Sequence, residues 1–229
     1  MSYFDYLIFL FYPYVALSIF VSVSIFRFFY RPYNWKTASS EIFEDKILRL
    51  GSNLFHFGIL ALFFGHLFGL LTPERVFQLV GLSSGVHQMI EIALGSVFGA
   101  ITIIGVLLLI FRRFTNKLVL ATSTSMDIFV ILWIFFTLCV GMMCVIYSFL
   151  FERDGHLLLY LSQYVKNLLT FRFQAINYLN MIPVIYRVHM FLGFTLFLIL
   201  PFSRLVHIFS GFALPIYLVR KTQIVIKKF

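Results

Sequence analysis

Five long apolar stretches without a charged residue constrain this chain more than any other feature of its sequence. A helix of about 20 residues crosses the roughly 30 Å hydrocarbon layer of a membrane. The stretches are continuous runs and do not alternate apolar with polar residues, as the strands of a membrane barrel would. We therefore predict an all-α fold, an integral membrane bundle of five transmembrane helices in a single domain over 1–229. The expected spans are approximately 6–27, 48–71, 88–111, 126–150 and 184–209.

The composition supports a membrane protein. Hydrophobic residues make up 61 % of the 229 residues, charged residues 12 %, and 31 residues are Phe. Soluble domains are nearer half apolar and about a quarter charged. Because so few charges would not cover a soluble surface, a water-soluble domain is excluded, and the apolar content excludes a disordered chain.

Lysine and arginine are distributed unequally between the two sets of loops. Cytoplasmic loops of membrane proteins carry the excess of these residues, so the N-terminus is predicted outside and the C-terminus in the cytoplasm. Because the basic residues flank apolar spans and form no single patch, binding of nucleic acid is not expected. The side with more charges holds Arg27, Arg31, Lys36, Lys46, Arg49, Arg112, Arg113, Lys117, Arg204, Arg220, Lys221, Lys227 and Lys228, and the other side holds Arg75, Arg153, Lys166, Arg172 and Arg187.

The segments between the spans carry two further predictions. The outer loop, about 152–182, contains the amphipathic run Leu157–Phe171, which predicts a short interfacial helix. Pro183 suits the first turn of the fifth span, and Pro201 is expected to kink that helix.

Four of the six histidines lie in or at the ends of two spans: His56 and His66 in the second, His189 and His207 in the fifth. Ionisable side chains in hydrocarbon are costly and usually functional. A single one is as readily explained by a hydrogen bond to a neighbouring helix. Two pairs on two helices favour a shared ligand.

The order of the histidines predicts how they pair. If the two spans are antiparallel neighbours, His66 lies beside His189 and His56 beside His207. The separations are about 15 Å along the second span and about 27 Å along the fifth, and 18 residues is five whole turns, so His189 and His207 share a face. Each pair is suited to holding the iron of a planar tetrapyrrole from its two faces.

Other residues bear on this metal site. Small residues let a flat macrocycle approach a helix, and Gly58, Gly65, Gly69 and Gly193 are expected to line it. Zinc fits less well, because a tetrahedral site needs four ligands together. The two cysteines, Cys139 and Cys144, form no C-x-x-C motif, which excludes a thioredoxin-type site and covalent c-type haem.

Arg187 and Arg204 are candidate partners for haem propionates. They are equally well explained as arginines that extend from span ends to the membrane surface.

In these histidines and the motifs around them, the chain resembles the gamma subunit family of respiratory nitrate reductases. The resemblance covers essentially the whole sequence. Both histidine pairs occur in the family with the spacings of 10 and 18 found here. The matching segments are Tyr12-Pro13-Tyr14, Ala38-Ser39-Ser40, Ser52-Asn53-Leu54-Phe55-His56, Gly65-His66, Phe68-Gly69, Leu71-Thr72-Pro73, Tyr186-Arg187-Val188-His189 and Pro201-Phe202-Ser203-Arg204-Leu205-Val206-His207.

The resemblance implies a cytochrome b of the inner (cytoplasmic) membrane with two haem b groups. The outer haem would be held by His66 and His189 and the inner haem by His56 and His207. It further implies that the subunit oxidises membrane quinol at the outer haem. Its electrons would pass to an iron–sulfur beta subunit and then to a molybdenum-cofactor alpha subunit that reduces nitrate.

The sequence departs from the family at the start of the third span. The family often has a lysine there, beside the quinol site, whereas this chain reads Gly85-Val86-His87-Gln88-Met89. We expect quinol near Gly65, His66 and His87, with His87 exchanging a proton with a quinol oxygen; an interfacial loop histidine is the alternative. Glu91, one turn on, is a candidate proton relay, and His156 is expected to be solvent-exposed.

Two questions stay open at this point. The segment Arg31-Pro32-Tyr33-Asn34-Trp35 is a candidate anchor for the iron–sulfur partner, but related cytochromes serve complexes for nitrite oxidation or for sulfite or disulfide reduction. A haem-free proton-coupled transporter or anchor is the alternative from another class, although the repeated halves and broken helices of transporters are absent.

Overall fold

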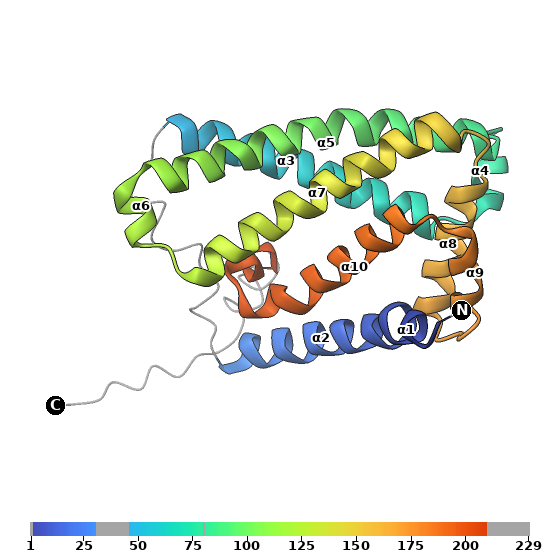
Figure 1. Cartoon of the computed structure of the whole chain (residues 1–229), viewed down its shortest axis with the longest axis horizontal. Coiled ribbons are helices and arrows are strands. Elements are labelled where there is room, and N and C mark those ends of the chain that lie inside the picture. Colours follow the sequence, from blue (N-terminus) through green and yellow to red (C-terminus); the bar gives the residue numbers. More distant parts are fainter. Residues whose placement is uncertain (1, 31–45, 80, 210–229) are drawn as a thin grey trace, which may run out of the picture.

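The computed structural model describes residues 2–30, 46–79 and 81–209, and within these ranges the chain contains helices and no strands. Five of the helices are long and apolar enough to cross a membrane, and they lie side by side in one bundle (Figure 1). The predicted all-α membrane fold is confirmed. The orientation of the termini stays a prediction. The five candidate spans are Tyr3–Phe29, Lys46–Leu71, Ser84–Thr115, Ser125–Phe151 and Val184–Phe202.

Short helices mark the two ends of the bundle (Figure 1). One end, here called the α4/α8 end, carries α4 (Glu74–Leu79), α8 (His156–Leu169), α9 (Ala175–Tyr178) and η4 (Leu179–Met181). The opposite α6/η6 end carries α6 (Lys117–Ala121) and η6 (Arg204–Phe209). The spans themselves are α1 (Tyr3–Tyr6), η1 (Leu7–Phe11) and α2 (Tyr12–Tyr30), then α3 (Lys46–Leu71), α5 (Ser84–Thr115), α7 (Ser125–Phe151), and α10 (Val184–Ile199) with η5 (Leu200–Phe202).

Helices α3 and α5 pack backbone against backbone through glycines. A β-carbon on Gly105 would lie 2.8 Å from the Cα of Phe55 and 3.0 Å from the carbonyl oxygen of Gly51. A β-carbon on Gly58 would lie 3.0 Å from the carbonyl oxygen of Phe98. Small residues at such interfaces let membrane helices approach closely. The glycines therefore fix α3 against α5.

This packing corrects one prediction about the glycines of α3. Gly58 and Gly69 were expected to face a macrocycle, but both face α5: Gly58 meets Phe98, and a β-carbon on Gly69 would lie 2.6 Å from Oε1 of Glu91. The spacing of the glycines defines a helix face but does not identify the neighbour that the face meets.

Helix α8 is anchored to backbone carbonyls of two spans. Pro13 has no N–H to donate to the carbonyl of Phe9, and the hydroxyl of Tyr164 donates to that oxygen instead, at 2.6 Å. The hydroxyl of Ser162 donates to the carbonyl of Leu70 near the end of α3, at 2.8 Å. The helix predicted within Leu157–Phe171 is confirmed, over His156–Leu169.

Helix α10 begins at Val184 and departs from the predicted fifth span, 184–209, at its far end. Pro183 is the residue before α10, not part of its first turn. Helix α10 ends at Ile199, and His207 lies on the 3-10 helix η6. Pro201 has no N–H for a helical hydrogen bond, and beyond this break the Arg27 guanidinium donates to the carbonyls of Pro201 and Ser203.

The helix expected to reach residue 209 with a kink at Pro201 is instead interrupted around that proline, and the chain continues as η5 and η6. The five-turn argument for a common face of His189 and His207 was therefore wrong.

Candidate functional site

Two pairs of histidines face each other between the second and fifth spans. The rings of His66 on α3 and His189 on α10 have their centres 6.1 Å apart, at an interplanar angle of 36°. The rings of His56 on α3 and His207 on η6 have their centres 6.0 Å apart, at 69°. Because His56 precedes His66 by ten residues, the pairs lie about 15 Å apart along α3. The structure brings together the same partners that the order of the residues predicted.

Three of these histidines are oriented by the backbone one turn earlier. Nδ1 of His66 lies 2.7 Å from the carbonyl oxygen of Leu62, that of His56 lies 2.8 Å from the oxygen of Ser52, and that of His207 lies 2.8 Å from the oxygen of Arg204. A carbonyl oxygen only accepts, so each Nδ1 must carry the proton. In the neutral ring this leaves a lone pair on Nε2, the state that binds a metal.

His189 differs from the other three, since its Nδ1 is buried and no carbonyl one turn earlier orients it; the backbone of Thr137 on α7 is the polar group beside the ring. Its ring lies against Gly141 of α7, where a β-carbon would be 2.9 Å from Cε1. The sequence analysis missed Gly141, although it is the only glycine of the fourth predicted span. Gly193, one turn after His189, faces open space, with no atom within 4 Å of a β-carbon built there.

His87 and Glu91 form a second polar group at the start of α5. Nε2 of His87 lies 3.6 Å from Oε1 of Glu91, one turn later. The imidazole stacks on Phe77 of α4, with 3.8 Å between ring centres. Although His87 is only 9 % exposed, its Nε2 makes no hydrogen bond to a described residue. His87 is thus a buried histidine with one unsatisfied nitrogen.

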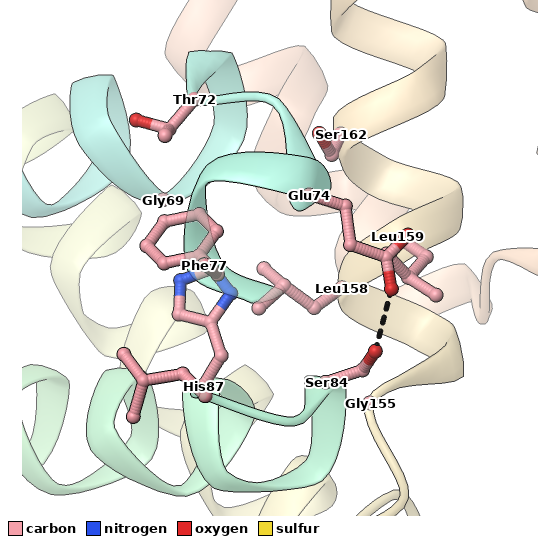
Figure 2. Close-up of a pocket in the computed structure, with 11 residues that line it drawn as sticks. Gly69, Thr72, Glu74, Phe77, Ser84, His87, Gly155, Leu158, Leu159 and Ser162 are labelled. Carbon is pink, nitrogen blue, oxygen red and sulfur yellow. Dashed lines mark hydrogen bonds between the residues drawn. The ribbon is translucent and has the colours of Figure 1, made fainter. Parts of the chain in front are cut away.

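A small pocket adjoins this group at the α4/α8 end (Figure 2). Its cavity volume is about 20 Å³, room for a water molecule but not for a quinol ring. Figure 2 shows Glu74 within it, and the hydroxyl of Ser84 donates to Oε1 of Glu74 at 2.7 Å. The polar side chains that line the pocket are Thr72, Glu74, Ser84, His87 and Ser162.

The two candidate propionate partners both have protein partners. Nε of Arg187 donates to the carbonyl of Ile182 at 2.8 Å. Nε of Arg204 lies 3.1 Å from Oδ1 of Asp127, a carboxylate that is 7 % exposed. The sequence analysis did not single out Asp127, which is the N3 residue of the capping box that starts α7.

The remaining predicted residues are placed as follows. The side chain of His156 is 66 % exposed, as expected. Cys139 and Cys144 are free thiols. Across the described ranges, no three His, Cys, Asp or Glu side chains converge as a metal site of that kind would need. The candidate anchor Arg31–Trp35 and the basic C-terminal tail lie outside the described residues.

The fold and the site together define a class, that of helical multi-pass membrane proteins with paired histidines inside the bundle. Comparison with known proteins is more specific, because the profile of the nitrate reductase gamma subunit family matches residues 5–228. This chain belongs to the nitrate reductase gamma subunit family, as its motifs suggested.

Curated relatives support the assignment over nearly the whole chain. The gamma chain of respiratory nitrate reductase 1 from Escherichia coli is 37 % identical over 215 residues, 93 % of each chain. The gamma chain of respiratory nitrate reductase 2 from the same organism is 36 % identical over 195 residues, 85 % of each chain. The nitrate reductase gamma chain of Bacillus subtilis is 30 % identical over 216 residues, 94 % of this chain and 95 % of the relative.

Proposed function

We propose that this chain is the quinol-oxidising cytochrome b subunit of a respiratory nitrate reductase in the inner membrane. In this role it holds two haem b groups and passes electrons from quinol to an iron–sulfur subunit. The observation that carries the proposal is the pair of facing imidazoles at each of two depths in the bundle. Family membership supports the choice of complex.

The separation of the facing rings fits two imidazoles that would hold one iron between them. A metal–imidazole bond is about 2 Å long, and the centre of the ring lies about 1 Å beyond the bonded nitrogen. Two facing imidazoles that bind one metal would therefore have their ring centres about 6 Å apart. The observed centres are 6.1 Å and 6.0 Å apart. His66 with His189, and His56 with His207, would hold the two haems.

The chemistry of the donors also fits haem iron. The Nδ1 contacts of His56, His66 and His207 favour neutral imidazoles with Nε2 free to bind. Bound haem supplies one-electron chemistry, and two haems in line would conduct electrons along the bundle. The chain itself contributes the ligands, their orientation and an apolar surrounding.

We infer that the α4/α8 end faces the outside of the cell, so that His66 and His189 hold the outer haem. The distribution of lysine and arginine supports this orientation. Quinol would then bind near Gly65, His66 and His87, in the outer half of the membrane. Arg187 and Arg204 stay candidates for the propionates, each shared with the partner described above.

The partners follow from the same proposal. A gamma chain of this kind would deliver electrons to an iron–sulfur beta subunit, which serves a molybdenum-cofactor alpha subunit. The relatives are named as gamma chains of nitrate reductases, which supports this assignment over nitrite oxidation or over sulfite or disulfide reduction.

One purification tests the proposal. The protein is extracted in mild detergent, a reduced-minus-oxidised spectrum is recorded, and the co-purifying subunits are identified. We expect a b-type spectrum when quinol is the only reductant added. We also expect a molybdenum subunit that reduces nitrate to co-purify. Absence of a b-type signal would favour the haem-free transporter or anchor. A b-type signal with a different catalytic subunit would assign the cytochrome to another complex.

A further inference from the structure

We propose that Glu91, His87 and Glu74 form a proton exit route from the quinol site to the α4/α8 end of the bundle. The inference rests on the proposed quinol oxidation and identifies the residues that would remove its protons. Three observations carry it: a carboxylate inside the third span, a buried histidine beside it with an unsatisfied nitrogen, and a polar pocket beyond that histidine.

Glu91 starts the route because its carboxylate lies between α5 and the bare backbone of α3. A β-carbon on Gly69 would be 2.6 Å from Oε1, and one on Gly65 would be 3.8 Å from Oε2. Gly65 directly precedes His66 in α3, so the carboxylate lies at the same depth in the bundle as the histidine pair at which quinol is proposed to react. No basic side chain that could pair with Glu91 permanently is found within 4 Å among the described residues, His87 excepted.

His87 is the second member of the route. Its Nε2 is 3.6 Å from Oε1 of Glu91, so a modest side-chain movement makes the hydrogen bond through which a proton passes. The ring is held by its stacking on Phe77. An imidazole accepts a proton at one nitrogen and releases one from the other, which suits a relay between two carboxylates.

Glu74 completes the route at the surface. It lines the pocket together with His87 (Figure 2), and the pocket has room for a water molecule that would bridge the two. Ser84 orients the Glu74 carboxylate through its hydroxyl. The other charged group nearby is Lys166 of α8, whose Nζ donates to the carbonyl of Thr72 at 2.8 Å.

The proton balance is simple. Each quinol O–H bond breaks, its proton goes to the Glu91 carboxylate, and its electron pair stays on the oxygen. The oxidant of the proposed function, ferric haem held by the histidine pairs, would accept the two electrons of each quinol one at a time. Protonated Glu91 gives its proton to His87, and the imidazolium releases one to the pocket water and Glu74. Two passages therefore remove both protons.

The experiment uses the whole complex in proteoliposomes, comparing Glu91→Gln with wild type. We expect quinol-driven haem reduction to slow by about 100-fold, a typical contribution of a positioned proton acceptor. Haem content and reduction by dithionite should stay unchanged. Asp154→Asn is the matched control, because it removes a carboxylate that is 60 % exposed at the same end of the bundle; it should stay within about twofold of wild type.

A second readout does not depend on turnover. Infrared difference spectra of the oxidised complex, titrated with acid in the absence of quinol, should contain a buried carboxylic-acid band that Glu91→Gln removes. If Glu91→Gln does not assemble, Gly69→Ala is tested instead, because its methyl group displaces the Glu91 carboxylate without removing it. Quinol oxidation at the wild-type rate in the variant that assembles, or an infrared band that persists in Glu91→Gln, overturns the route. A wild-type complex that quinol cannot reduce would instead overturn the proposed function.

Discussion

Gly141 on α7 lies against the imidazole of His189 on α10, so closely that a β-carbon at position 141 would be 2.9 Å from Cε1 of the ring. Carbon atoms pack at about 3.5–4.0 Å, so any larger residue must push the ring or the helix away. The glycine therefore sets the position of one of the four proposed haem ligands.

Gly141→Ala should lower the haem content at the His66/His189 pair. The methyl group shifts His189 by a few tenths of an ångström or more, and disturbing the support of a metal ligand costs about 10–100-fold in affinity. Haem titration of the purified variant measures this loss. Gly95→Ala is the control, because its β-carbon would meet only a methyl of Val145, at 3.3 Å. Equal haem content in the two variants would contradict the role of Gly141.

Arg27→Met should weaken haem binding at the His56/His207 pair. The Arg27 side chain donates to the carbonyls that Pro201 and Ser203 expose where the fifth span breaks, and His207 follows on η6. Without the Arg27 guanidinium, the carbonyls at this break lose a charge-assisted donor. A hydrogen bond to a charged group contributes about 1.5–3 kcal/mol to stability.

We expect the Arg27→Met variant to lose haem from the His56/His207 pair and to keep the haem at His66/His189. Spectra recorded during a redox titration distinguish the two haems. Lys117→Met, which removes an exposed cation at the same end of the bundle, should keep both. Loss of the haem at His66/His189 instead would show that the Arg27 hydrogen bonds do not position His207.

Tyr164→Phe should destabilise the fold by about 1–3 kcal/mol, the cost of an unsatisfied buried carbonyl. Tyr164 is fully buried, and its hydroxyl is the donor to the carbonyl of Phe9 that Pro13 leaves free. Urea unfolding followed by circular dichroism measures the effect. Tyr160→Phe on the same helix is the control, since its hydroxyl makes no hydrogen bond to a described residue.

The same tyrosine makes stability depend on pH at the alkaline side. Burial raises the pKa of Tyr164 above its usual value of 10.0, so the folded protein keeps this proton when the unfolded chain loses it. Its contribution to stability is complete below pH 10 and is lost as the pH rises through the folded pKa. Tyr164→Phe should show a smaller loss of stability above pH 10 than wild type; an identical loss would contradict this cause.

Much of the fold followed from the sequence because the membrane allows so few solutions. Uncharged runs long enough to span predict helices, and the order of His56, His66, His189 and His207 along two antiparallel spans predicts which rings meet. The depth of a residue in the membrane follows from its position along a spanning helix, and the sequence gives that position directly.

The failures concern contacts between helices. Helix α10 ends at Ile199, two residues before Pro201, and Arg27 from another span donates to the carbonyls of Pro201 and Ser203 beyond the break. Gly58 and Gly69 were assigned to the wrong neighbour, and Gly141 was missed, because the sequence does not say which helix a glycine meets. The pairing of Glu91 with His87 could be predicted, since four residues is about one turn.

The pairing of the four histidines is tested most directly by haem stoichiometry in single and double variants. If His66 and His189 hold one iron, then His66→Ala, His189→Ala and the double variant should each retain one haem per chain, and the same one. His56→Ala and His207→Ala should retain the other, and His156→Ala should retain both. A double variant His66→Ala/His189→Ala that holds no haem, or one that still holds two, would contradict the account.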